Sequence, residues 1–82
     1  MKKHIGFFTQ ESRIFYESLK FNVSLGEEYS DSEVTSVLQK VGLGYLVDRI
    51  GLHNAEVNLD ESLSGGEKAR ICIARLLLRK YQ

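Results

Sequence analysis

The segment from Ser64 to Lys80 carries the strongest helix signal in this 82-residue chain. Ser64 and Glu67 have the spacing of a capping box, in which the serine hydroxyl accepts from the Glu67 amide and the Glu67 carboxylate reaches back. No Gly or Pro interrupts the run from Lys68 to Lys80. Apolar residues surround most of this helix, so we expect it to be buried on several sides.

A second capping box, Ser30 with Glu33, predicts another helix, which Gly42 or Gly44 would end. The remaining elements are short, and the fold class they predict is mainly α with one short N-terminal strand. We expect a strand over Ile5–Thr9, a loop over Gln10–Ser18, a helical turn over Ser18–Ser24, a short helix over Tyr45–Ile50 and a polar loop over Gly51–Ser62.

The composition argues against several classes of protein. Lys and Arg number 11 and Asp and Glu number 11, so no charge excess favours nucleic acid or an anionic membrane as a partner. His4 and His53 have no ligand-spaced neighbours and are expected to be surface histidines rather than metal ligands. Cys72, the only cysteine, lies in an apolar helix and is expected to pack rather than react.

Leu63-Ser64-Gly65-Gly66-Glu67 is the segment most suited to chemistry. Two glycines allow another group to approach the backbone closely. The first amides of the following helix have no internal partners and carry the positive end of its dipole, so they favour an anion such as phosphate. A plain capping box after a glycine-containing turn would produce the same local pattern.

This segment and the helix after it resemble the signature motif of ATP-binding cassette (ABC) proteins, through Arg70 and the run Ile71-x-Ile73-Ala74-Arg75-x-Leu77-Leu78. Upstream, the run from Ile5 to Gln10 resembles the strand that leads into the family's Q-loop glutamine. Phe15 with Ser18-Leu19-x-x-Asn22-Val23 is similar to the exporter pattern after that glutamine. The resemblance covers essentially the whole chain.

The resemblance implies a fold and a domain. Residues 1–82 would form part of an ABC ATPase domain, with the Q-loop, the helical subdomain and the signature helix of an α/β P-loop NTPase. Exporters usually carry a Gly-Glu-x-Gly segment just before the signature. Here Val57–Asp60 stands in that place, with Asn58 at the glutamate position.

The resemblance also implies site residues and partners. Ser64, Gly65, Gly66 and Glu67 would contact ATP held by a second nucleotide-binding domain. Gln10 would lie near the nucleotide's Mg²⁺ and couple it to movement of the helical subdomain. A transmembrane domain would be contacted by Phe15, Tyr16 and Leu19.

The sequence contains no Gly-x-x-x-x-Gly-Lys-Ser/Thr phosphate loop and no apolar strand ending in Asp-Glu. Because these parts supply most transition-state stabilisation in P-loop ATPases, we expect this chain alone not to hydrolyse ATP and not to bind ATP or Mg²⁺ tightly. The parent protein would be an ATP-driven transporter at the cytoplasmic face of the cell membrane, with this fragment soluble.

Two other functions fit parts of the pattern. One is a fragment of a soluble ABC-family ATPase without a membrane partner, and the pattern from Phe15 to Val23 favours the exporter over it. The other is a non-enzymatic helical interaction module, and the match along the whole chain argues against that. The cations Arg70, Arg75, Arg79 and Lys80 are expected to be solvated or to lie at a domain interface.

The isolated chain is expected to self-associate. One apolar side of the last helix, formed by some of Ile71, Ile73, Ala74, Leu77 and Leu78, would be left exposed, and each such side chain forfeits roughly 1.5–3 kcal/mol. Large exposed apolar patches favour association. Sedimentation of the purified chain at about 100 μM, where contacts as weak as 10 μM are populated, should show oligomers. A well-folded monomer would contradict this expectation.

Overall fold

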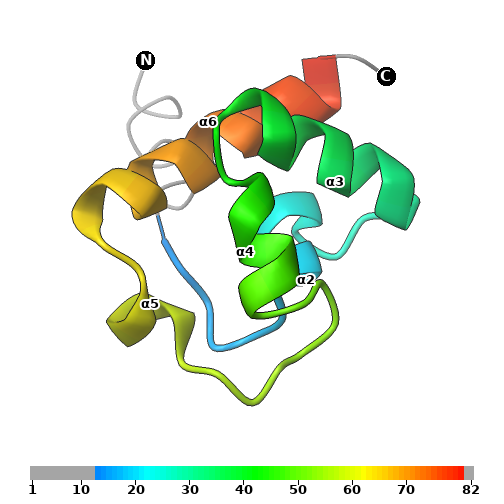
Figure 1. Cartoon of the computed structure of the whole chain (residues 1–82). Helices are drawn as coiled ribbons and strands as arrows, with labels where there is room; N and C mark the ends of the chain where they lie inside the picture. Colours follow the sequence, from blue (N-terminus) through cyan, green and yellow to red (C-terminus); the bar gives the residue numbers. More distant parts are fainter. Residues whose placement is uncertain (1–12, 81–82) are drawn as a thin grey trace, which may run out of the picture.

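The computed structural model describes residues 13–80, and every regular element in this range is a helix (Figure 1). The mainly α fold class is therefore confirmed for the described residues. The expected strand over Ile5–Thr9 and the Q-loop residue Gln10 lie outside them. The helices, in chain order, are α2 (Leu19–Ser24), α3 (Asp31–Lys40), α4 (Gly44–Arg49), α5 (Leu59–Ser62) and α6 (Gly65–Lys80).

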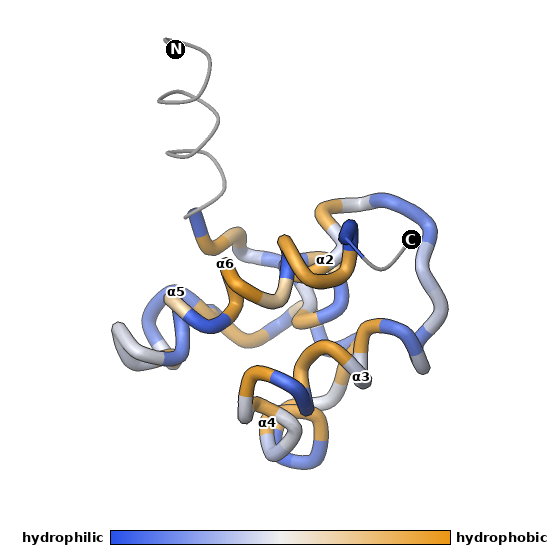
Figure 2. The backbone as a smooth tube through the Cα atoms, turned by 90° about the horizontal axis from the view of Figure 1, so that it is seen from above, coloured by the Kyte–Doolittle hydropathy of each residue, from blue (hydrophilic) through white to orange (hydrophobic). Residues whose placement is uncertain are grey.

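Helix α6 is the longest element, and both α2 and α3 pack against it, while α4 packs against α3 (Figure 1). Hydrophobic and hydrophilic stretches alternate along the helices (Figure 2), as expected for helices that bury one face. The core is built from aliphatic side chains of all five helices and of the segments between them. Its fully buried members are Leu19, Val23, Val34, Leu38, Leu43, Leu46, Leu59, Ile71 and Ala74.

The predicted helix starts are confirmed where local capping sets them. At α3, the Ser30 hydroxyl accepts from the Glu33 amide at 3.1 Å, and the Ser30 amide donates to Glu33 Oε1 at 2.9 Å. At α2, the Ser18 hydroxyl accepts from the Phe21 amide at 3.0 Å. Helix α3 ends before Gly42, whose φ of 81° lies in the left-handed region that favours glycine.

The predicted loop over Gly51–Ser62 is wrong at its end, where Leu59–Ser62 form the single turn α5. Asn58 caps this turn, because its side-chain oxygen accepts from the Glu61 amide at 3.4 Å. Leu59 then points into the core. Asn58, the residue at which the chain departs from the exporter pattern, thus has a local structural role as a helix cap.

One expectation about α6 is wrong and a second holds only in part. Arg75 is fully buried, whereas the sequence suggested a solvated or interface cation. Of the candidates for the exposed apolar side, Ile71, Ala74 and Leu78 are instead in the core, and Ile73 is exposed. The exposed large apolar side chains of α6 are Ile73, at 49%, and Leu76, at 57%.

The buried charge of Arg75 is stabilised by hydrogen bonds to the chain before and within α2. Its Nε donates to the Asn22 carbonyl at 2.6 Å, and its Nη2 donates to the Arg13 carbonyl at 2.6 Å. A longer bond of 3.4 Å joins Nη2 to Asn22 Oδ1. Since buried charges are tolerated only with such partners, these bonds fix α6 against the segment from residue 13 to residue 22.

Asn22, also fully buried, extends this network through its side-chain amide. Its Oδ1 accepts from the Phe15 amide at 2.8 Å. Its Nδ2 donates to the carbonyls of Phe15, Glu17 and Ser18 at 3.1, 3.2 and 3.0 Å. One side chain therefore holds the non-helical segment 13–18 in place.

Replacing Asn22 with Ala should lower the free energy of unfolding by about 3 kcal/mol, because buried groups left without partners cost about 1–3 kcal/mol each. Urea denaturation of the chain measures this loss. Asn54→Ala is the matched control, since the side chain of exposed Asn54 accepts from the Glu56 amide alone among residues 13–80, and its loss should cost within about 0.5 kcal/mol. Equal stabilities for the two variants would contradict the role assigned to Asn22.

Candidate functional site

The candidate site is the turn from Ser64 to Glu67, where α6 begins. The predicted capping box is confirmed: the Ser64 hydroxyl accepts from the Glu67 amide at 3.1 Å, and the Ser64 amide donates to Glu67 Oε1 at 2.8 Å. Ser64, Gly65 and Gly66 are exposed. Within the described part of the chain, the amides of Gly65 and Gly66 have no hydrogen-bond acceptor, so two donors face outward at the positive end of α6.

Neither glycine is required by the conformation of the chain itself. A Cβ atom added at Gly65 would meet nothing within 4 Å, and one at Gly66 would meet only Ser64 Oγ, at 4.0 Å. Neither residue has a positive φ. Both glycines stand at the start of α6, and none of the described residues requires glycine at either position.

A second element, α4, reaches the site through Tyr45. The Tyr45 hydroxyl donates a hydrogen bond to Glu67 Oε2, so each oxygen of this carboxylate has a donor. The guanidinium of Arg49, one turn further along α4, lies 5.9 Å from the centre of the Tyr45 ring. Sequence reasoning missed Tyr45 and Arg49. Their spacing of four places them on one helix face, but nothing local shows that this face meets Glu67.

These contacts shift the pKa values of the two groups in opposite directions. The hydrogen bond from Tyr45, followed by the bond from the Ser64 amide, holds the pKa of Glu67 below its ordinary value. The same bond to Glu67 raises the pKa of Tyr45, because an ionised phenol could not donate. At neutral pH the site therefore contains an ionised Glu67 and a protonated Tyr45.

The three residues expected to contact a transmembrane domain differ in how far they are exposed to solvent. Tyr16 is 62% exposed, and its hydroxyl donates to the Glu56 carbonyl at 3.4 Å. Phe15 is partly buried and packs edge-on against Phe21, with the ring centres 5.9 Å apart. Leu19 lies fully inside the core. Only Phe15 and Tyr16 of the three therefore present surface.

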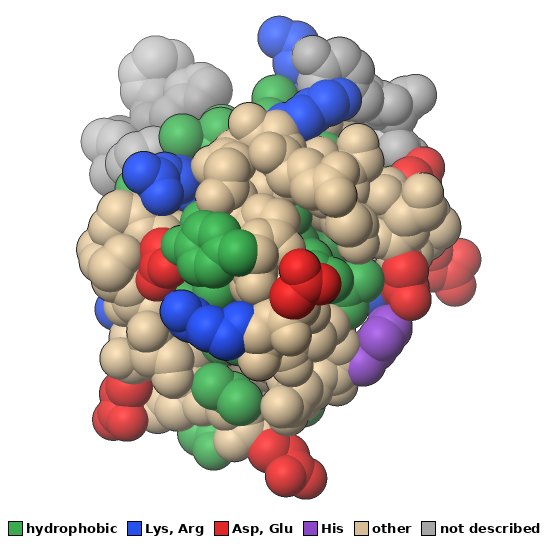
Figure 3. Space-filling model, viewed as in Figure 1, with side chains coloured by type: hydrophobic (Ala, Val, Ile, Leu, Met, Phe, Trp, Pro, Cys, Tyr) green, Lys and Arg blue, Asp and Glu red, His purple; other side chains and the backbone are tan. Residues whose placement is uncertain are grey.

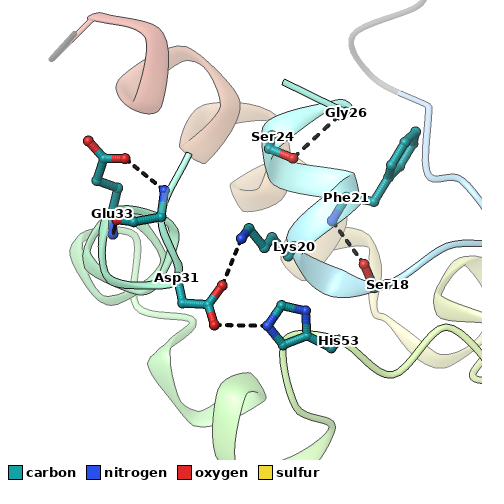
Figure 4. Close-up of polar contacts among 9 residues, drawn as sticks. Ser18, Lys20, Phe21, Ser24, Gly26, Asp31, Glu33 and His53 are labelled. Carbon is teal, nitrogen blue, oxygen red and sulfur yellow. Dashed lines mark hydrogen bonds and ion pairs between the residues drawn. The ribbon is translucent and has the colours of Figure 1, made fainter. Parts of the chain in front are cut away.

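A polar cluster elsewhere on the surface joins three segments (Figure 4). Asp31, at the start of α3, accepts from Lys20 Nζ at 2.7 Å and lies 2.8 Å from His53 Nε2. These contacts hold the pKa of Asp31 below its ordinary value, Lys20 first and His53 second. His53 is exposed, as predicted for a surface histidine. Among residues 13–80, no group of three potential metal ligands lies together.

The face of the molecule seen in Figure 3 does not carry charges of a single sign. On the side seen in Figure 3, acidic and basic side chains are interspersed, and hydrophobic groups appear as separate small areas. Near the site, Lys68 Nζ forms an ion pair with Asp60 at 3.1 Å. Over the described residues, no helix has both the length and the apolar character needed to cross a membrane.

Comparison with known proteins shows which protein family and which relatives this chain is similar to. The sequence profile of the ABC transporter family matches residues 1–82. The chain is 36% identical over 84 residues to a Rickettsia bellii protein whose name assigns it to the export ATP-binding/permease proteins, with 100% of this chain aligned. It is 36% identical over 78 residues, 93% of its length, to the microcin-J25 export ATP-binding/permease protein McjD of Escherichia coli.

A eukaryotic relative is the mitochondrial iron-sulfur clusters transporter ATM1 of Candida glabrata, with 35% identity over 82 residues and 96% of this chain aligned. The chain spans only 15%, 13% and 11% of the Rickettsia, Escherichia and Candida proteins, respectively. No solved structure matches this chain.

Because a Cβ at Gly65 would meet no described residue within 4 Å, Gly65→Ala should leave the free energy of unfolding unchanged or raise it by up to about 1 kcal/mol, through improved helix propensity. Gly42→Ala is the matched control and should lower it by about 1 kcal/mol, since Gly42 has a φ of 81°. Thermal or urea unfolding of both variants provides the measurement. A clear loss of stability in Gly65→Ala would mean that this glycine serves the fold rather than a partner.

Proposed function

Because this chain belongs to the ABC transporter family, we propose that it forms the signature-bearing helical part of an ATPase domain that drives export across a membrane. The observation that carries this proposal is the exposed start of α6, where the residues that the structure describes give the two glycines no packing partner and their amides no acceptor. The names of the relatives, which describe export and transport proteins, favour this function over a soluble ATPase without a membrane partner.

In this proposal the ligand of the site is the γ-phosphate of ATP bound to a second nucleotide-binding domain. The amides of Gly65 and Gly66 and the Ser64 hydroxyl would donate to phosphate oxygens, and the dipole of α6 would favour the negative charge. Absent side chains at both glycines would let phosphate reach the backbone. ATP and Mg²⁺ supply the reacting phosphoryl group and its charge compensation in such ATPases.

The other proposed contacts lie upstream of α6. Gln10, outside the described residues, would lie near Mg²⁺. Phe15 and Tyr16 would meet the transmembrane domain at the cytoplasmic face of the membrane. The polar network of Asn22 and Arg75 joins this surface to α6, so movement of segment 13–18 would be passed to the helix that carries the phosphate contacts.

Gly65→Asp in the intact ATPase that carries this segment tests the proposal. A carboxylate about 4 Å from the γ-phosphate would repel it by about 4 kcal/mol in a partly solvated site, which corresponds to roughly a thousandfold. We expect ATP hydrolysis and transport to be lost while the melting temperature changes little. Ser36→Asp, which places the same charge on an exposed position of α3, is the control and should retain both activities. Normal transport by Gly65→Asp would remove the proposed role of the site.

A further inference from the structure

The carboxylate of Glu67 is held from two directions. Its Oε1 closes the capping box on the Ser64 amide at 2.8 Å, and its Oε2 accepts from the Tyr45 hydroxyl. The first contact belongs to the local turn, whereas the second comes from α4, 22 residues earlier in the chain. Tyr45 is thus a long-range partner of the turn that carries the open amides.

Arg49 strengthens this arrangement from the same helix. Its guanidinium lies over the Tyr45 ring, with 5.9 Å from Cζ to the ring centre, and its positive charge further favours the ionised form of Glu67. Tyr45 itself is 45% exposed. An exposed side chain contributes little to the stability of the core. The hydrogen bond between Tyr45 and Glu67 therefore requires an explanation other than folding.

The electrostatics of the site supply that explanation. Glu67 carries a negative charge within one helical turn of the Gly65 and Gly66 amides, which are the groups proposed to receive phosphate. A carboxylate free to rotate would repel an incoming phosphate and would compete with it for the helix start. A carboxylate fixed on the Ser64 amide and the Tyr45 hydroxyl has both oxygens occupied by donors.

We propose that Tyr45 is a positioning residue for the nucleotide-contact site, because it holds the Glu67 carboxylate in the capping box and away from the amides that receive phosphate. This inference rests on the function proposed above. Tyr45 touches neither phosphate nor metal in this account and acts only through Glu67. Its removal should therefore weaken ATP engagement more than it slows the chemical step.

The test is a double-mutant cycle in the intact ATPase, with Tyr45→Phe, Glu67→Gln and the double variant. Tyr45→Phe should raise the KM for ATP about tenfold and change kcat less than about twofold. In the Glu67→Gln background, which has no carboxylate to restrain, Tyr45→Phe should change KM less than about twofold.

Tyr29→Phe is the matched control, since the Tyr29 hydroxyl also donates to a glutamate, Glu27 at 3.3 Å, on the segment between α2 and α3. It should leave KM unchanged, and both Phe variants should have similar melting temperatures. A KM for Tyr45→Phe equal to that of Tyr29→Phe would overturn the inference, as would an undiminished effect of Tyr45→Phe in the Glu67→Gln background.

Gly65→Asp, measured in parallel, distinguishes failure of the role assigned to Tyr45 from failure of the proposed function. Loss of hydrolysis in Gly65→Asp together with a silent Tyr45→Phe would overturn the role of Tyr45 alone. Normal hydrolysis in Gly65→Asp would overturn the proposed function and, with it, the role of Tyr45.

Discussion

The guanidinium of Arg75, buried in the middle of α6, requires hydrogen-bond acceptors, and these acceptors fix where α2 and the segment before it lie against α6. Arg75 obtains them from the carbonyls of Arg13 and Asn22, and Asn22 in turn binds the backbone from Phe15 to Ser18. Because an unpaired buried charge is costly, α2 and the segment before it have little freedom to move independently of α6.

Helix α6 is therefore attached to another segment at its middle and exposes backbone amides at its start. Its middle is fixed to segment 13–18, which presents Phe15 and Tyr16. Its start presents the open amides of Gly65 and Gly66. A helix with a hydrogen-bonded attachment at its middle and the proposed phosphate site at its start is suited to pass movement between them. This arrangement supports the proposed coupling of nucleotide engagement to a membrane partner.

Features set by neighbouring residues were predictable from the sequence. The capping boxes of α3 and α6 each need a serine and a glutamate three residues apart, so the spacing suffices. The cap of α2, where the Ser18 hydroxyl accepts from the Phe21 amide, is equally local. The phosphate-binding interpretation of Ser64–Gly66 also arose from local pattern and family resemblance.

Features set by distant contacts were not predictable. Arg75 reads as a surface cation until its acceptors, 53 and 62 residues away, are known, and Tyr45 gives no local sign of meeting Glu67. Helix α5 was missed because a single turn among polar residues has no periodicity to detect.

We propose that Ser64, Gly65 and Gly66 receive the phosphate of a nucleotide bound to another domain. A structure of the intact ATPase with ATP bound and hydrolysis blocked tests this proposal. We expect γ-phosphate oxygens about 3 Å from the Gly65 and Gly66 amides, with the nucleotide otherwise held by the opposite domain. An ATP-bound structure in which these amides face solvent, or in which a side chain of the same domain fills the space above them, would contradict it.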